Sequence, residues 1–513
     1  MQRRTLLQSL PATGAPFLTA GLGWAPPSHA ADDAPAPGPA WTRESPLTAA
    51  DLRSDLALLD RLYRELHPGL LRYQTAGQWQ HAVQALDAHW ARRAEHRLDT
   101  AYLDCSRLLA RVRCGHTYAN FYNQKPAVAQ ALFAGRNKLP FTFVWLQQKM
   151  VATGGALPAG TRVLTVDGVP AAQVLARLLP LVRADGHNDD KRRALLSVDA
   201  REGYETFDIF HALSTPAGPE VVLTVQRPGE GPRGVTLPTL DLTERRAMSL
   251  RPRTPPSDAT PPWSLRFDEA GNALLDMPGW ALYNSDWNWA AWLDRQLDAV
   301  VQARAPRLIV DLRRNEGGLD CGDAILARCT DRPLPVRADE RLVRYRRVPA
   351  ELNAVMDTWD DSFRDWGDRA EPWPERPGFY RLRPADGASP GSGETGGQTI
   401  EPRGPRFTGA LQVLTSSTNS SATFRFASLV REHRLGTLIG GSTGGNQRGV
   451  NGGAFFFVRL PRTGLEVDLP LIGYFPSGPL RPDAGLTPDV PVPLTLADLT
   501  AGRDRALDAA RRR

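Results

Sequence analysis

The stretch LQVLTSSTNSSATFRFASLVREHRLGTLI, residues 411–439, carries the pattern that decides the fold class. Its apolar run over 411–415 predicts a buried strand, and residues 437–439 predict another. Between them, the apolar residues of 422–434 recur at helical spacing. A strand, a helix and a second strand in close succession are typical of a parallel sheet with a crossover helix.

The same alternation begins near residue 270. Residues 272–277 predict a strand, 289–301 an amphipathic helix and 307–312 a second buried strand. We therefore expect an α/β domain over 266–500. It is interrupted by a long insertion at 331–405, whose 384–398 stretch is rich in Gly, Ser and Pro and is expected to be mobile. Towards the end of this domain, 454–460 and 466–471 predict a hairpin-like pair of strands.

The chain before this domain divides into three further parts. Residues 47–124 predict a helical part with three amphipathic helices, the first of them capped by Thr48. Residues 138–230 predict a β-rich module, in which Gly-Thr-Arg-Val-Leu-Thr-Val-Asp-Gly-Val-Pro at 160–170 resembles the core of a PDZ domain. Residues 231–265 are rich in Pro, Arg and Thr and predict a linker, and 501–513 predict a basic C-terminal tail.

Composition excludes several classes of protein. The apolar fraction of 42% argues against wholesale disorder and against a polytopic membrane protein. The net charge of +6 comes from 62 basic and 56 acidic residues that are interspersed, so it does not indicate a nucleic-acid partner. Basic residues are almost all Arg, and no Lys follows Lys191.

The N-terminal residues predict export. Arg3 and Arg4 precede a modest apolar run, and Ser28-His29-Ala30 places small residues where a signal peptidase cleaves. Residues 1–30 therefore resemble a twin-arginine signal peptide, followed by a flexible leader over 31–46. We expect a periplasmic or extracellular protein without a membrane span once the signal is removed.

Four cysteines offer disulfides in an exported chain. Cys105–Cys114 and Cys321–Cys329 are the local pairings among three possible connectivities. A metal site would have to use Cys105, Cys114 and His116, whose spacing matches no zinc pattern, so no metal is predicted.

Two segments follow predicted strands of the α/β domain, where such sheets bind ligands. The first, 311–319, contains Gly317-Gly318, which can form either an ordinary turn or a loop whose amides bind an oxyanion. The second places Ser421 at the start of a helix, where it can serve as a helix cap or as a nucleophile beside the first helical amides. Neither segment alone decides between these interpretations.

Four motifs in order do decide. Asp-Leu-Arg-x-Asn-x-Gly-Gly from 311, Ser-Ala-x-x-x-x-Ala from 421, Gly-x-x-Thr-x-Gly from 440 and Gly-Leu-Thr-Pro-Asp from 485 resemble one serine peptidase family. That family contains the carboxy-terminal processing (tail-specific) proteases, the tricorn protease core and interphotoreceptor retinoid-binding protein. Further matches are His-Pro-Gly-Leu at 67–70, Cys-Gly-His-Thr at 114–117 and the PDZ-like stretch, so the resemblance covers about residues 47–500. The implied catalytic fold is the crotonase-like (ClpP-like) ββα superhelix.

The resemblance implies roles for individual residues. Ser421 falls at the family's nucleophile, and Gly317, Gly318 and the amide of Ala422 fall at its oxyanion hole. Asn446 stands where the processing proteases have their Lys base. An Arg cannot replace that Lys, because a guanidinium does not lose its proton at neutral pH.

The tricorn branch uses a His instead, and His116 falls at its position with a suitable ordinary pKa. Asp483 is the candidate acid to orient this His, and Phe424 stands where the family usually has a Glu. We therefore expect an exported serine peptidase of the His-using branch that acts on peptides or proteins and needs no cofactor. The alternative is an inactive binding protein for an apolar ligand or a peptide, as Phe424 and the missing Lys leave open. Oligomeric state and substrate specificity stay open.

Overall fold

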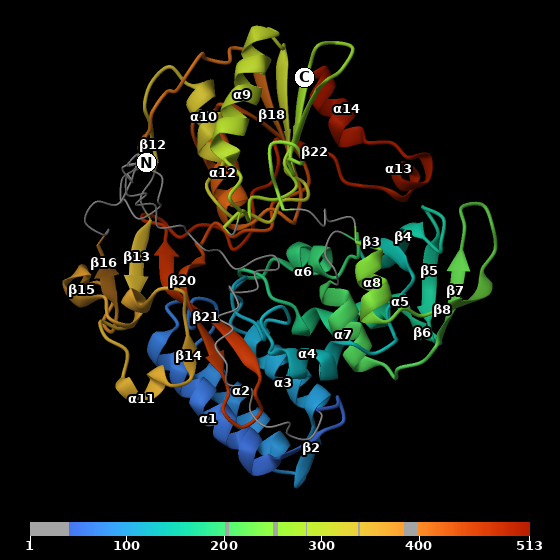
Figure 1. Cartoon of the computed structure of the whole chain (residues 1–513), viewed down its shortest axis with the longest axis vertical. Helices are drawn as coiled ribbons and strands as arrows, with labels where there is room; N and C mark the ends of the chain where they lie inside the picture. The colour runs from blue at the N-terminus through green and yellow to red at the C-terminus, as the bar shows by residue number, and fades with distance from the viewer. Residues whose placement is uncertain (1–40, 201–204, 250–254, 284, 337–338, 384–398) are drawn as a thin grey trace, which may run out of the picture.

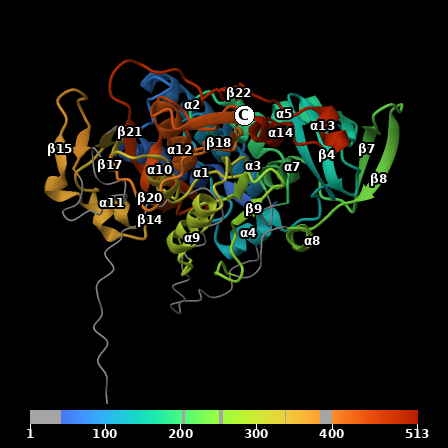
Figure 2. The same cartoon turned by 90° about the horizontal axis from the view of Figure 1, so that it is seen from above.

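The computed structural model describes residues 41–200, 205–249, 255–283, 285–336, 339–383 and 399–513. The predicted signal peptide, most of the leader and the 384–398 stretch lie outside these ranges. Four parts surround the middle of the molecule (Figure 1): a helical part at the bottom, a β-rich module at the right, a sheet with its helices at the top and a second sheet at the left. Seen from above, the β-rich module and the second sheet lie at opposite ends (Figure 2).

The helical part confirms the three predicted helices. Thr48 caps the first helix by accepting the amide of Asp51, and this helix ends at His67 because the next residue is Pro68. Arg43, within the predicted leader, donates from Nε to Oδ2 of Asp99 at 3.0 Å, so the end of the leader is attached to this part. Its elements are β1 Pro46–Thr48, α1 Ala49–Leu66, α2 Ala76–Trp90, β2 Glu95–Arg97, α3 Leu98–Ala110 and α4 Pro126–Phe133.

The β-rich module is a sheet of strands in the order β3-β4-β5-β7-β8, with β6 paired to β5. Its last strand and helix lie in the stretch for which the composition predicts a linker. The elements are β3 Phe141–Leu146, β4 Lys149–Gly155, β5 Arg162–Val166, β6 Val169–Pro170, α5 Ala171–Leu178, η1 Leu179–Leu181, α6 Asp189–Leu195, α7 Thr206–Ser214, β7 Glu220–Gln226, β8 Arg233–Pro238 and α8 Leu242–Ala247.

The largely parallel sheet predicted from 411–439 is confirmed. Strands follow the order β22-β19-β18-β11-β10-β9. Among the described strands of this sheet, neighbours are parallel except for β9, which pairs antiparallel with β10. The elements are β9 Ser264–Phe267, β10 Ala273–Asp276, α9 Trp289–Gln302, β11 Arg307–Asp311, α10 Gly322–Cys329, β18 Ala410–Thr415, α12 Ser421–Glu432, β19 Gly436–Gly440, β22 Val490–Pro491, α13 Leu496–Ala501 and α14 Arg505–Arg512. The predicted basic tail thus contains α14, which buries Ala506, Leu507 and Ala510 against the sheet.

The second sheet combines the insertion with the predicted strand pair, which is antiparallel as expected. Its strands follow the order β14-β20-β21-β13-β16-β15. The elements of this region are β12 Leu334–Pro335, β13 Glu340–Val343, α11 Ala350–Asn353, β14 Met356–Asp357, η2 Asp361–Arg364, η3 Gly367–Arg369, β15 Ala370–Pro372, β16 Tyr380–Leu382, β17 Thr399–Ile400, β20 Asn451–Arg459 and β21 Glu466–Phe475.

Two large apolar cores hold these parts. One runs continuously through the helical part, the β-rich module and the second sheet. The other lies between the parallel sheet and α9, α10 and α12. Within the described residues, no helix combines the length and the apolar character needed to cross a membrane.

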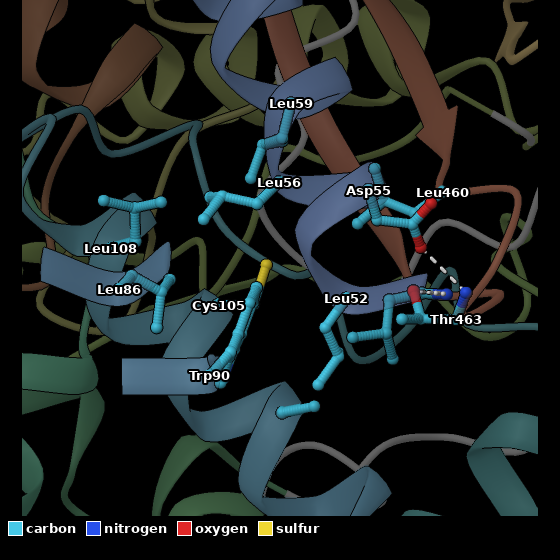
Figure 3. Close-up of a pocket in the computed structure, with 12 residues that line it drawn as sticks. Leu52, Asp55, Leu56, Leu59, Leu86, Trp90, Cys105, Leu108, Leu460 and Thr463 are labelled. Carbon is cyan, nitrogen blue, oxygen red and sulfur yellow. Dashed lines mark hydrogen bonds between the residues drawn. The ribbon is translucent and has the colours of Figure 1, made fainter. Parts of the chain in front are cut away.

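A small cavity in the first core lies between α1, α2, α3 and the loop after β20. Figure 3 shows apolar side chains such as Leu52, Leu56 and Leu108 around it, together with the carboxylate of Asp55. That carboxylate accepts the amide of Thr463 at 2.7 Å and so fixes the loop between β20 and β21. The free volume of about 10 Å³ is at the lower limit for one water molecule. The cavity is a packing gap and has no room for the apolar ligand of the alternative function.

All four cysteines are free thiols, so none of the disulfides that the sequence allows is formed in the structure. Cys321 caps the start of α10 and Cys329 is its last residue. Eight residues of helix separate their Cα atoms by about 12 Å. A disulfide requires less than about 7 Å, so the local pairing of these two, one of the pairings that the sequence leaves open, is excluded. Cys105 lies on α3 facing the packing gap of Figure 3, whereas Cys114 lies in the loop after that helix.

Candidate active site

Two loops meet at the carboxyl ends of β11 and β18. These strands are parallel neighbours, with Asp311 opposite Leu414, so the loops that follow them lie side by side. Asn419 fixes this arrangement, since its Nδ2 donates to the carbonyl oxygens of Leu312 at 2.5 Å and Asn315 at 2.9 Å. The glycine-containing loop and the turn before α12 are therefore held together by buried hydrogen bonds.

Ser421 is the first residue of α12 and has a backbone conformation that is unusual for serine. Its φ of +50° lies in the left-handed region, where residues other than glycine are strained and often functional. Ser420 occupies the cap position, but its hydroxyl does not cap the helix. It donates to the carbonyl oxygen of Glu316 at 3.0 Å instead. Of the two adjacent serines, Ser421 is therefore the one whose hydroxyl is left for chemistry.

The glycine pair passes directly beside this serine. Both glycines have positive φ, +124° for Gly317 and +137° for Gly318. A Cβ on Gly317 would lie 3.0 Å from Cβ of Ser421 and 3.1 Å from the amide nitrogen of Ala422, so only glycine permits this approach. The Gly317 amide donates to Oδ1 of Asn315 at 2.9 Å.

The predicted oxyanion donors therefore differ in availability. Gly317 shapes the loop while its own N–H is used internally. The N–H of Ala422 lies in the first turn of α12, where amides have no acceptor within the helix. The amides of Gly318 and Ala422 are thus the ones suited to bind an oxyanion.

The loop after α3 brings His116 to the same place. His116 and Ser421 line one cavity of about 10 Å³, together with Gly115, Arg183, Ala184, Asp185, Lys191, Glu316, Gly317, Ser420 and Gly444. The ring is only 5% exposed, packs edge-on against Phe455, and its Nδ1 has no hydrogen-bond partner among the described residues. No hydrogen bond joins His116 to Ser421 in the described structure, as is common in serine hydrolases without substrate.

Electrostatics keep this imidazole neutral. Burial lowers the pKa of His116 below its ordinary value of 6.5, while the Asp185 carboxylate opposes this shift and the Arg183 guanidinium adds to it. A neutral imidazole can accept a proton at physiological pH.

The candidate orienting acid, Asp483, lies elsewhere. Its carboxylate contacts Nδ1 of His187 at 2.6 Å and accepts Nδ2 of Asn446 at 2.7 Å, and no hydrogen bond of the described residues joins it to His116. Asp185 is the carboxylate near the ring: one of its oxygens and one ring nitrogen of His116 lie within 4.8 Å of each other. Asp185 also accepts the amide of Gly115 at 2.8 Å, directly before the histidine.

Asn446, at the position of the family Lys, is fully engaged in structural hydrogen bonds. Besides Asp483, its Nδ2 donates to the carbonyl oxygen of Asp185 at 3.2 Å. Its Oδ1 accepts the amide of Arg448 at 2.9 Å. Asn446 therefore ties the segment around Asp185 to the catalytic sheet and leaves no group there that could act as a base.

The cavity also holds a buried cluster of charges that the sequence does not predict. Lys191 of α6 donates from Nζ to Oε1 of Glu316 at 2.6 Å, and Arg183 approaches the same oxygen at 3.2 Å. Burial opposes the charge of Glu316, but the two cations outweigh it and lower its pKa to about 2. The only sequence signal is that Lys191 is one of four Lys in a chain that otherwise uses Arg.

One group of side chains has the spacing of a metal site. A thiol of Cys114, a ring nitrogen of His116 and a carboxylate oxygen of Asp185 lie within 4.8 Å of one another. Asp185 is already bonded to the Gly115 amide, and burial raises the pKa of Cys114 to about 11, which keeps the thiol protonated. Within the same cluster, the carboxylate of Asp185 lies beside the imidazole of His116, as the partner of a general base would.

Comparison with known proteins identifies the family of one domain and the fold. Residues 272–492 match the sequence model of Peptidase family S41, and this range contains both active-site loops of the parallel sheet. No curated protein is similar enough in sequence to count as a match.

Solved structures of mature CPAF share the fold. The crystal structure of mature CPAF has a TM-score of 0.58 and 15% identity, over 90% of this chain and 96% of that chain. Mature CPAF complexed with lactacystin gives 0.58 and 14%, over 90% and 97%. The photosystem II D1 C-terminal processing protease also matches, with a TM-score of 0.40 and 13% identity over 88% of this chain and 97% of that one. Residues 272–492 therefore form a domain of Peptidase family S41, which supports a serine peptidase.

Proposed function

We propose that the protein hydrolyses peptide bonds with Ser421 as nucleophile and His116 as general base, as in the His-using branch of the family. The observation that carries this proposal is the shared cavity: residues from the helical part and from the parallel sheet, far apart in sequence, line one space. His116 takes the hydroxyl proton while Ser421 attacks the carbonyl carbon. His116 then returns this proton to the leaving amine, and water repeats the cycle on the acyl-enzyme.

The other groups of the site support this reaction. The amides of Gly318 and Ala422 stabilise the oxyanion that forms on the carbonyl oxygen. The negative charge of Asp185 stabilises the imidazolium that forms when His116 accepts the proton. The residues themselves supply nucleophile, base and oxyanion donors, so the proposed reaction uses no cofactor. Peptides or proteins are the proposed substrates, as the peptidase family implies.

Replacement of the nucleophile tests the proposal. Ser421→Ala should lower hydrolysis of a peptide library by about 10⁶-fold and abolish labelling by a fluorophosphonate, because the hydroxyl of the neighbouring Ser420 is bonded to the carbonyl oxygen of Glu316. Ser428→Ala is the matched control, since its hydroxyl lies on the same helix and bonds the carbonyl oxygen of Phe424. Fluorophosphonate labelling of Ser421→Ala at the wild-type rate would contradict the proposal. Absence of labelling in the wild-type protein would favour the inactive binding protein.

We also propose that the protein is exported by the twin-arginine route and acts in the periplasm or outside the cell. Support comes from Arg3-Arg4 and from Ser28-His29-Ala30, both outside the described residues. N-terminal sequencing of the exported protein should find a start near Ala31. A mature protein that retains residues 1–20 would contradict the signal assignment.

A further inference from the structure

A fully buried ammonium lies beside the proposed catalytic groups. Lys191 of α6 is 2% exposed, and a lysine is rarely so buried unless its charge is paired. Its Nζ donates to Oε1 of Glu316 at 2.6 Å, to the carbonyl oxygen of Thr418 at 2.8 Å and to Oγ of Ser420 at 3.3 Å. An ammonium has three donors, so these contacts use all of them.

The three acceptors belong to the two loops that build the site. Glu316 directly precedes Gly317 in the oxyanion loop, and Thr418 and Ser420 form the turn directly before Ser421. Ser420 closes the arrangement, since its hydroxyl also donates to the carbonyl oxygen of Glu316 at 3.0 Å. One cation therefore joins the backbone that carries the oxyanion donors to the backbone that carries the nucleophile.

The same cluster reaches the histidine loop. Arg183 contacts Oε1 of Glu316 at 3.2 Å and donates to the carbonyl oxygen of Gly115 at 2.6 Å, directly before His116. The Glu316 carboxylate thus lies between two cations, one bonded to the nucleophile turn and the other to the histidine loop. All three functional segments share this one buried carboxylate.

Helix α6 holds the ammonium in place from the side of the β-rich module. Asn188 caps the helix, with Oδ1 accepting the amide of Lys191 at 3.1 Å. Its Nδ2 donates to the carbonyl oxygens of Thr443 at 3.1 Å and Gly445 at 3.2 Å in the parallel-sheet domain. Asn188 therefore fixes the start of α6 to that domain. Because Lys191 lies in the first turn of this helix, its Nζ has little freedom to move.

We propose that Lys191 is a positioning residue for hydrolysis, which holds the oxyanion loop and the Ser421 turn at the spacing that the tetrahedral intermediate requires. The inference rests on the proposed function. Lys191 is not assigned as the base, because its Nζ is bonded to Glu316, Thr418 and Ser420 and no hydrogen bond of the described residues joins it to Ser421. Nor does it replace the family Lys at Asn446, since it comes from a different part of the chain and bonds Ser420 rather than Ser421.

Lys191→Met tests this role by keeping the length and apolar stem of the side chain while removing the charge and its three hydrogen bonds. We expect kcat per folded molecule to fall by about 10²–10³, the range for disturbing an oxyanion site, with little change in KM. Fluorophosphonate labelling of Ser421 should slow in parallel. The rising limb of kcat/KM should remain, since that ionisation belongs to His116, and it should move to higher pH because the charge of Lys191 lowers the pKa of this ring.

Lys138→Met is the matched control. Lys138 is also buried, at 1% exposed, and its Nζ donates to the carbonyl oxygens of Phe133 and Gly135, away from the cavity. Its replacement should lower thermal stability while leaving kcat per folded molecule unchanged. This comparison separates the loss of any buried lysine from the loss of the one at the site.

A double-mutant cycle with Glu316→Gln completes the test. If Lys191 acts through the carboxylate, Lys191→Met combined with Glu316→Gln should lose much less activity than the product of the two single effects. The proposal is overturned if Lys191→Met retains wild-type kcat, if only its stability falls, or if the rising limb of the pH profile disappears. Ser421→Ala in the same assay keeps the two proposals apart, because a fully active Ser421→Ala overturns the proposed function whatever Lys191→Met does.

Discussion

At the scale of the residue, burial decides which group can act as base. The cavity places a histidine and a lysine within reach of the same loops. Burial favours the uncharged form of both and lowers the pKa of Lys191, while its ion pair with Glu316 at 2.6 Å opposes that shift. His116 has the Asp185 carboxylate near its ring, but its Nδ1 has no hydrogen-bond partner among the described residues, and burial lowers its pKa. The site thus holds a lysine whose Nζ is bonded to Glu316 and an imidazole that is free to accept a proton.

The pH dependence of hydrolysis follows from this difference. A neutral imidazole is required, so kcat/KM should rise with pH through the ionisation of His116 and then reach a plateau. Because burial lowers the pKa of this ring below 6.5, the rising limb should lie on the acid side of pH 6.5. Steady-state kinetics of the free enzyme from pH 4 to 9 check this. A limb centred above pH 7 would contradict the assignment of His116.

Substitution should agree with this profile. His116→Ala should cost about 10²–10⁴ in rate, the usual range for a positioned acid–base group. His211→Asn is the matched control, because burial lowers the pKa of His211 to about 4 as well, yet this ring stacks on Phe207 in the β-rich module. That variant should lose stability and retain its turnover. Equal losses of turnover in both variants would point to a structural role for His116.

At the scale of the element, periodicity in the sequence predicts most of the secondary structure. The apolar spacing of α1, α2, α3 and α12 and the short apolar runs of β11, β18 and β19 lie where expected, because each element buries one face in a local pattern. The sequence of Arg505–Arg512 predicts a charged tail, because only three of its residues, all small or apolar, are buried against the sheet. Composition alone could not reveal that packing.

The site itself was predictable only where motifs fix it. Ser421 and the glycine pair follow adjacent strands, and the parallel register brings such loops together. Lys191 lies in Asp-Asp-Lys-Arg-Arg, a run typical of a solvated helix face, and its burial results from contacts with Glu316 and Thr418 far along the chain. Asp185 lies beside His116 in place of the predicted Asp483 for the same reason. Contacts between residues far apart in sequence cannot be predicted from local spacing.

One contact between elements should control the position of the histidine loop. Asp468 of β21 is fully buried and accepts Nδ2 of Asn120 at 2.7 Å and Nδ2 of Asn123 at 3.1 Å, just after His116. Asp468→Asn leaves one acceptor oxygen for two amide donors, which should lower the free energy of unfolding by about 1–3 kcal/mol. The displaced loop should also lower kcat. Urea unfolding and steady-state kinetics measure the two effects.

Asp357→Asn is the control for this prediction. Asp357 lies in the same sheet, but its carboxylate is 69% exposed and pairs with Arg459 at the surface. Exposed ion pairs contribute little, so this variant should resemble the wild type in both measurements. If Asp468→Asn were as stable and as active as Asp357→Asn, β21 would not hold the histidine loop.

At the scale of the whole molecule, the active site joins bodies with separate cores. The loop of His116 packs, through Cys114 and Tyr118, into the core that runs through the helical part, the β-rich module and the second sheet. Ser421 starts a helix of the core on the parallel sheet. Around the cavity, the two bodies are joined by polar side chains, among them Lys191 and Asn188 of the β-rich module. Such contacts break more readily than an apolar core, so the site should open before either body unfolds.

This arrangement predicts that activity is lost before the fold in a urea titration of the full-length protein. The half-loss of kcat, measured at saturating substrate so that urea cannot act by competing for the site, should occur at a lower urea concentration than the half-loss of far-ultraviolet circular dichroism. Trp79 of the first core and Trp280 of the second are fully buried, so tryptophan fluorescence should follow the later transition. Dilution from the intermediate concentration should restore full activity at once, because neither core has to refold. Transitions that coincide by all three probes would mean that the polar contacts around Lys191 unfold together with the cores, and that the site is as stable as the molecule that carries it.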